Sequence, residues 1–142
     1  MSEGKNLIQD ISNKLLKIRE IKERIVKRTK KYRSNLEKKY TNEIIENVTN
    51  VDLLDIKKDI NNALDKIDIE EEIIRLDSHV FELDKILKRK WSKGLKIDFY
   101  MQEINREANT ISSKSKDPKL SEYAIAIKTY LNQIREIAAN IT

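Results

Sequence analysis

The most specific chemistry in this sequence lies in the stretch IDFYMQEINREANTISSKS, residues 97–115. One acid and three amides recur there at steps of four, three and four residues, so they would form a single stripe along a helix. The stripe consists of Asp98, Gln102, Asn105 and Asn109, and it is flanked by Glu103, Arg106 and Glu107. Two carboxylates four residues apart repel each other unless a cation lies between them. That cation is either the Arg106 guanidinium or a divalent metal, since hard cations take oxygen ligands from carboxylates and amides.

An earlier segment carries a second polar stripe of the same design, formed by Glu72, Arg75, His79 and Glu82. If the two segments pack as an antiparallel helical hairpin, the two stripes would line one groove. That groove would combine one imidazole, several carboxylates and an arginine. Such a set suits metal-assisted cleavage of a phosphodiester, in which the metal activates water while His or Glu moves protons.

Each of these features also has a purely structural interpretation. The acids at 70–72 would begin a helix, where the helix dipole favours them in any protein. The imidazole of His79 borders an apolar seam and fits a structural histidine equally well, and Glu103 with Arg106 fits an ordinary intrahelical ion pair. Trp91, set among lysines, suits base stacking but also the capping of a bundle.

The elements that must position these residues are predicted to be helices. The chain has 142 residues, enough for one domain, with 37% charged residues, two glycines and one proline. The absence of cysteine excludes a disulfide framework and thiolate chemistry. The sequence contains no apolar run of the roughly 20 residues that a membrane span needs, and no secretory signal. We therefore expect a cytoplasmic protein with no membrane association.

Apolar residues at alternating steps of three and four predict five helices. The first runs from about residue 5 to 46, and the second from 53 to 67. The third begins after Asp68, a predicted N-cap with Glu71 in the capping-box position, and ends near Trp91. The fourth spans 97–111, and the fifth starts at Asp117-Pro118, where the proline suits the first helical position. The fold class is therefore all-α, with a long helical arm over residues 1–50 and a compact antiparallel bundle of about four further helices over 51–142. An arm of roughly 60 Å would pack in part against another chain or a further domain.

The positive charge of the chain is concentrated in two segments. The net charge is +5, yet residues 17–39 hold eleven Lys/Arg against three Glu, and residues 85–96 hold six Lys/Arg and no acid. Residues 43–72 reverse the sign, with ten acids and three lysines. Segregated basic segments are typical of polyanion-binding proteins, although they also fit solvated helix faces.

Three segments resemble the YicC/YloC family of bacterial endoribonucleases. They are IDFYMQEINREANTISSKS at 97–115, DIEEEIIRLDSH at 68–79 and KTYLNQIREIAANI at 128–141. Full-length members of that family carry a further N-terminal α/β domain, which has no counterpart in this sequence. The resemblance therefore implies that the chain is a C-terminal helical piece. Leu95 departs from the basic residue usual in the family, which removes one expected phosphate contact.

The resemblance further implies cleavage of single-stranded RNA by a homo-oligomer, a hexamer in the family, with a divalent metal. The metal is usually assigned as manganese, with magnesium as the alternative. On the two stripes and this resemblance together we predict the following roles. Catalytic residues are Glu72, His79, Asp98, Glu103 and Glu107, of which His79, Glu103 and Glu107 hold the metal. RNA contacts come from Arg75, Lys96, Gln102, Asn105, Arg106, Asn109 and Lys114. The alternative function is a non-catalytic RNA-binding or oligomer-assembly module.

Overall fold

The computed structural model describes residues 2–47, 53–66, 68–89 and 94–140. Over these residues the chain forms five helices and no strand, so the all-α prediction is confirmed. The helices are α1 (Ser2–Asn47), α2 (Leu53–Lys66), α3 (Glu70–Leu87), α4 (Gly94–Lys114) and α5 (Pro118–Ala138). None of the described helices is both long enough and apolar enough to cross a membrane. Trp91 lies outside the described residues, so its predicted role stays a prediction.

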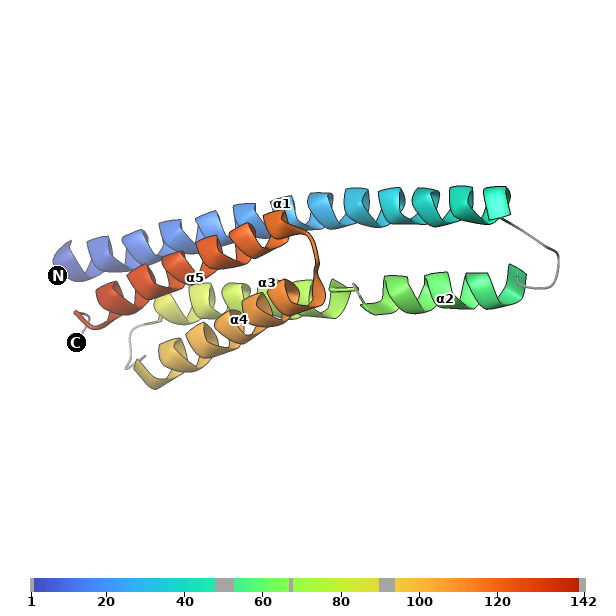
Figure 1. The fold of residues 1–142 in the computed structure, drawn as a ribbon. Helices are drawn as coiled ribbons and strands as arrows, with labels where there is room; N and C mark the ends of the chain where they lie inside the picture. The colour runs from blue at the N-terminus through green and yellow to red at the C-terminus, as the bar shows by residue number, and fades with distance from the viewer. Residues whose placement is uncertain (1, 48–52, 67, 90–93, 141–142) are drawn as a thin grey trace.

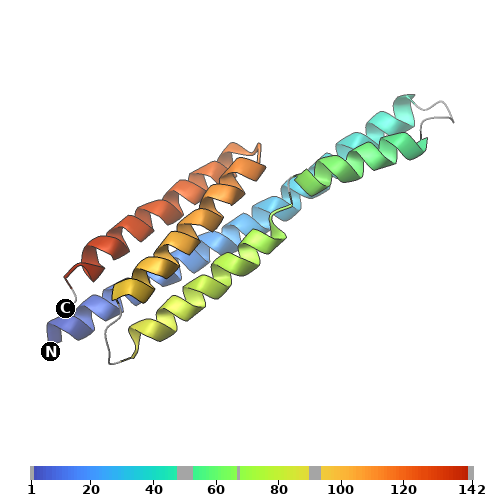
Figure 2. The same ribbon diagram turned by 90° about the horizontal axis from the view of Figure 1, so that it is seen from below.

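Four helical segments form a bundle, in which the first half of α1 packs against α3 and α5, and α4 packs against the same two helices (Figure 1). Each helix of the bundle runs antiparallel to the two helices that it packs against (Figure 1). The second half of α1 continues beyond the bundle and lies beside α2, and together they form a two-helix extension (Figure 2). The domain boundary predicted at residue 50 stays a prediction. However, α1, which precedes that boundary, packs against helices that follow it. The first half of α1 contributes fully buried isoleucines, whereas Tyr32 and Leu36 in the second half are only half-buried.

The core contains the apolar seams that the sequence predicted for the four bundle helices. Side chains from all four form one continuous cluster. Its members include Ile11, Leu15, Ile18 and Ile25 of α1, Leu76, Val80, Leu83 and Leu87 of α3, Met101, Ile104, Ala108 and Ile111 of α4, and Leu120, Ala124, Ile127, Leu131 and Ile134 of α5. Because these seams face inward, polar residues one position away from them lie at the edges where two helices meet.

The two predicted helix starts differ in outcome. Pro118 begins α5, as expected, and Asp117 is its N-cap, with its carboxylate accepting a hydrogen bond from the Lys119 N–H at 3.1 Å. The capping box predicted for α3 is wrong, because Ile69 rather than Asp68 is the N-cap. Ile69 is buried in the core, and its carbonyl accepts the first helical hydrogen bond from Ile73. The Asp68 carboxylate instead accepts from the Glu70 N–H at 3.0 Å.

A half-buried ion pair that the sequence did not predict joins α1 to the start of α5. Arg28 donates from Nε to Asp117 Oδ2 at 2.7 Å and from Nη2 to Oδ1 at 3.3 Å. The Asp117 side chain is buried, and the Arg28 guanidinium holds the pKa of this carboxyl below its usual value. The Asp117 carboxylate therefore caps α5 and also links α5 to α1, whose Arg28 lies 89 residues earlier in the sequence.

Replacing Asp117 with alanine is expected to lower the free energy of unfolding by about 1–2 kcal/mol, because α5 loses its cap. The variant Asp117→Asn, which keeps a cap oxygen but loses the charge, isolates the ion pair. Since the folded-state pKa is lowered, the ion pair stabilises the fold above about pH 4 and is lost as pH falls through that pKa. Denaturant unfolding from about pH 7 to pH 2 should show Asp117→Asn converging on the wild type in acid. A stability difference that is independent of pH would contradict the ion pair.

Candidate functional site

The antiparallel packing of α3 against α4 brings acidic and basic side chains of the two helices together along one edge. We call this set the α3–α4 polar strip. It consists of Glu71, Glu72, Arg75 and His79 of α3 and Glu103, Glu107 and Lys114 of α4. Arg75 and His79 lie four residues apart on α3, and Glu103 and Glu107 lie four residues apart on α4. Each of these four residues directly precedes a buried residue of the apolar seam, which places it on one side of its helix. Four carboxylates in the strip face two permanent cations and one imidazole.

Three members of the strip form a possible metal-binding set, which we call the metal-ligand group: His79, Glu103 and Glu107. One ligand atom from each lies within 4.8 Å of the others. His79 Nε2 is 4.0 Å from Glu103 Oε2, and both side chains are half-buried. The Glu107 side chain is only 7% exposed, so this carboxylate has lost most of its hydration. The convergence of these three residues depends on the register of α3 against α4.

Arg75 is the cation that lies among the carboxylates of the strip. Its Nε donates to Glu107 Oε1 at 3.0 Å, while its two terminal nitrogens reach Glu71 and Glu72 at 3.4 Å each. The hydrogen bond to Glu107 raises the pKa of Arg75. Arg106, considered for this place from the sequence, is exposed and forms no ion pair with the described residues. The guanidinium of Arg75 therefore holds Glu107 at the edge of the metal-ligand group.

The far end of the strip is organised around Glu72, whose side chain is only 4% exposed. Lys114 donates from Nζ to Glu72 Oε1 at 2.7 Å, and to the carbonyl of Asp68 at 3.5 Å. The other oxygen of Glu72, Oε2, is buried and has no hydrogen-bond partner among the described residues. Glu72, Lys114, Asp65, Asp68 and Glu71 line a hollow of about 250 Å³ between α2, α3 and α4. Both cations of the strip are therefore engaged with carboxylates.

The predicted amide stripe does not join the strip. Asp98, Gln102, Asn105 and Asn109 each follow a buried seam residue of α4, whereas Glu103 and Glu107 each precede one. The two sets therefore lie on opposite sides of the seam. Ser112, which also follows a seam residue, contacts Ser121 of α5 at 3.3 Å, so the amide side of α4 is turned toward α5. Asp98 accepts a hydrogen bond from Gln102 at 3.2 Å on an exposed surface. Lys96 is also exposed.

Two aromatic residues beside the metal-ligand group were not identified from the sequence. The Tyr100 ring lies 5.9 Å from the His79 ring, tilted by 49°. Phe99 meets Tyr100 edge to face, with ring centroids 5.1 Å apart. The signal that could have identified them is their spacing, because they stand four and three residues before Glu103 and so lie next to it on the helix surface.

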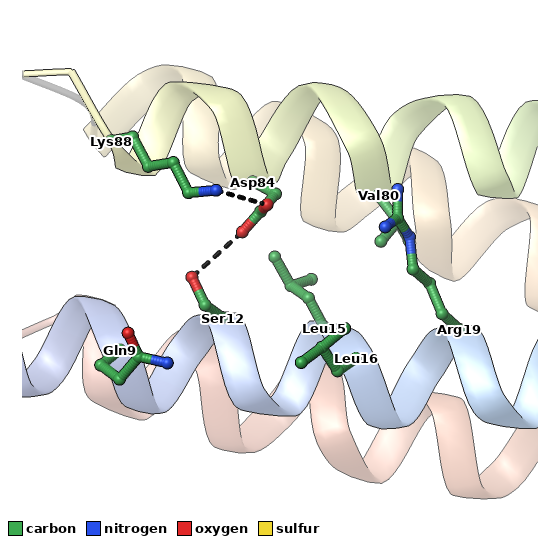
Figure 3. Close-up of a pocket in the computed structure, with 8 residues that line it drawn as sticks. All are labelled: Gln9, Ser12, Leu15, Leu16, Arg19, Val80, Asp84 and Lys88. Atoms are coloured by element: carbon green, nitrogen blue, oxygen red, sulfur yellow. Dashed lines mark hydrogen bonds and ion pairs between the residues drawn. The ribbon is translucent and has the colours of Figure 1, made fainter.

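A second hollow, of about 260 Å³, lies between α1 and α3 (Figure 3). The residues that line it include Leu15, Val80 and Asp84. Both oxygens of Asp84 are occupied, one by the hydroxyl of Ser12 at 3.0 Å and the other by Lys88 at 3.2 Å (Figure 3). This carboxylate is held as a structural link between α1 and α3, so the hollow offers no free acid or base.

Comparison with known proteins matches most of the chain. The family model described as "Endoribonuclease YicC-like, C-terminal" matches residues 16–142. The "Probable endoribonuclease YicC" of Clostridioides difficile (strain 630) is 36% identical over 143 residues, covering 98% of this chain and 48% of that protein. The protein of the same name from Haemophilus influenzae is 38% identical over 92 residues, covering 65% of this chain and 32% of that protein. The chain thus spans about half the length of the first relative and about a third of the second.

Proposed function

Because this chain belongs to the YicC-like endoribonuclease family, we propose that it forms the helical part of a metal-dependent endoribonuclease that cleaves single-stranded RNA. The observation that carries the proposal is the convergence of His79, Glu103 and Glu107 within 4.8 Å, inside the segment that the family model matches. His79 lies on α3 and the two glutamates lie one turn apart on α4, yet the packing of the two helices brings all three together at one edge of the bundle.

The donor set of the metal-ligand group suits a divalent transition metal. One imidazole nitrogen and two carboxylate oxygens are ligands that Mn²⁺ accepts, whereas Mg²⁺ prefers oxygen alone. The three ligand atoms lie within 4.8 Å of one another, a spread that one divalent ion could bridge only if the side chains moved closer together. Small side-chain rotations would therefore complete the site. We propose manganese as the natural ion, with magnesium as the weaker alternative.

The residues around the group would position its ligands. Arg75 holds Glu107 Oε1 and leaves the second oxygen of that carboxylate for the metal. Lys114 and Arg75 balance the buried charge of Glu72, which we propose to be a positioning residue that fixes Arg75. His79 Nε2 faces Glu103 Oε2, so these two atoms would bind the ion or exchange a proton. A bound divalent ion would supply an activated water and shield the phosphate charge.

RNA would approach the strip along the exposed surfaces of α4. Arg106 is an exposed cation one turn from the strip, and Lys96 extends that surface toward the start of the helix. Gln102, Asn105 and Asn109 would add hydrogen bonds to sugar or phosphate, which position RNA without reading its sequence. We further propose that the complete protein acts in the cytoplasm as a homo-oligomer, a hexamer as in the family.

Incubation of the 142-residue chain with an end-labelled single-stranded RNA is expected to yield cleavage products with Mn²⁺ and none with EDTA. A duplex RNA of the same sequence serves as the matched substrate and should be cut more slowly. Equal cleavage in Mn²⁺ and EDTA would contradict the metal-dependent mechanism.

The engagement of Arg75 with three carboxylates favours a second function, in which the strip is a structural ion-pair network of an RNA-binding module. Binding of RNA that weakens with salt, without cleavage in any metal, would support that alternative.

A further inference from the structure

Phe99 of α4 is 55% exposed to solvent, although α4 contributes a full seam to the core. Scattered apolar residues are common on protein surfaces and alone indicate nothing. Phe99 differs from the other exposed apolar residues in what its ring touches. It packs edge to face against Tyr100 at 5.1 Å, and Tyr100 lies 5.9 Å from the His79 ring. A continuous row of three rings therefore leads from solvent to the metal-ligand group.

The exposed phenylalanine of α3 provides a contrast. Phe81 is exposed to a similar degree, but Arg19 lies 5.9 Å from its ring centroid and Lys85 lies 5.5 Å from it. A cation near the face of an aromatic ring is attracted by the negative charge of its π-system, so the ring of Phe81 already has partners within the chain. Among the described residues, the ring of Phe81 contacts no other aromatic ring, so no row of rings links it to the metal-ligand group. Exposure alone therefore does not distinguish Phe99, whereas the row of rings does.

Resting on the proposed function, we propose that Phe99 and Tyr100 form a nucleobase subsite, which holds one unpaired RNA base beside the metal-ligand group. The exposed face of Phe99 takes the base by stacking, and Tyr100 supports the phenylalanine ring from the side. Single-stranded RNA is recognised mainly through unstacked bases that lie on aromatic side chains. A duplex keeps its bases stacked internally, so this subsite selects single strands.

The surroundings of Phe99 favour a base over the apolar face of another protein. Its neighbours along α4 are Asp98 and Lys96, and Gln102 lies one turn further on; all three are exposed polar residues. Among the described residues, Phe99 and the partly buried Tyr100 together offer only a small apolar area, below what protein interfaces bury in their centre. A nucleobase matches it better, because a base has apolar faces and polar edges.

The test is binding of a fluorescein-labelled 12-nucleotide oligoadenylate to the full chain in EDTA, measured by fluorescence anisotropy over a salt series. We expect Phe99→Ala and Phe99→Leu to weaken binding roughly tenfold to hundredfold. The slope of log K against log salt should stay unchanged, because no phosphate contact is lost. Phe99→Trp, which keeps a stacking face, should retain wild-type affinity. The matched control is Ile125→Ala, which removes an apolar side chain of α5 that is 62% exposed and should have no effect.

A second arm locates the base. An oligonucleotide with a single abasic position should bind the wild type more weakly, and it should bind Phe99→Ala no more weakly than the intact oligonucleotide does. If wild-type chain binds RNA but Phe99→Ala and Phe99→Leu bind equally well, the subsite is overturned and the proposed function stands. If Phe99→Leu restores binding, or if Phe99→Ala lowers the oligomeric mass in light scattering, the ring is an apolar contact between copies of the chain, which overturns the subsite. Absence of wild-type binding at low salt would overturn both proposals.

Discussion

A chain in which Glu103 and Glu107 are both replaced by glutamine is expected to bind Mn²⁺ at least about 100-fold more weakly than the wild type. Loss of residues that merely support metal ligands costs about 10- to 100-fold in affinity or activity, so loss of two anionic ligands should cost no less. Glutamine keeps the size and helical preference of glutamate, which leaves α4 intact. The cleavage rate in Mn²⁺ should fall by a similar or larger factor.

Isothermal titration with Mn²⁺ and cleavage of a labelled RNA measure the two effects separately. The matched control is Glu136→Gln, an exposed carboxylate on α5 outside the strip, which should leave both unchanged. Thermal unfolding of each variant checks that the bundle has formed. Unchanged Mn²⁺ affinity in the double variant would refute the metal-ligand group, whatever happens to cleavage. Loss of affinity together with full cleavage would show that the metal bound there is not the catalytic one.

Leu76→Ala is expected to lower the free energy of unfolding by about 3 kcal/mol, the largest effect on stability among these predictions. Leu76 is fully buried on α3 between the helices of the bundle, and its removal would leave a cavity that tightly packed neighbours fill only in part. Leu76 also adjoins Arg75 in sequence. A disturbed α3 should therefore loosen the contact between Arg75 and Glu107 and weaken Mn²⁺ binding as well.

The control for Leu76→Ala lies two residues away on the same helix. Ile74 is 61% exposed, so Ile74→Ala removes a similar side chain without opening a cavity, and the free energy of unfolding should change by no more than about 0.5 kcal/mol. Urea denaturation followed by circular dichroism measures both variants under the same conditions. If both substitutions lowered the free energy of unfolding equally, the described burial of Leu76 and exposure of Ile74 would be contradicted.

The bundle offers a rigid platform for the α3–α4 polar strip. His79 and Arg75 each directly precede a buried residue of α3, and Glu103 and Glu107 do the same on α4, so their backbone positions are fixed by the core. Side chains held on packed helices keep their relative positions better than those on loops. Only side-chain rotations would then separate the observed ion pairs from the metal site that we propose.

The sequence alone determined which residues lie on which side of each helix. Helical periodicity is a local property, so the seams of α3, α4 and α5 and the polar residues one position away from them could be read from spacing. The N-cap at Asp117 and the all-α class follow from similarly local preferences. The two seams also suggested an antiparallel hairpin whose polar stripes line one groove, but they did not show that Glu103 and Glu107, rather than the amides, would meet His79. The roles assigned to these residues remain predictions.

Only the tertiary structure decided which polar sides meet. The carboxylate side of α4 faces α3 and the amide side does not, and Arg75 rather than Arg106 lies beside Glu107. Likewise, Lys114 reaches Glu72 across 42 residues, and Arg28 reaches Asp117 across 89. The physical reason is that the rotation and axial shift of one helix against another come from the packing of core side chains on all four bundle helices at once. A single periodic segment carries no information about that packing.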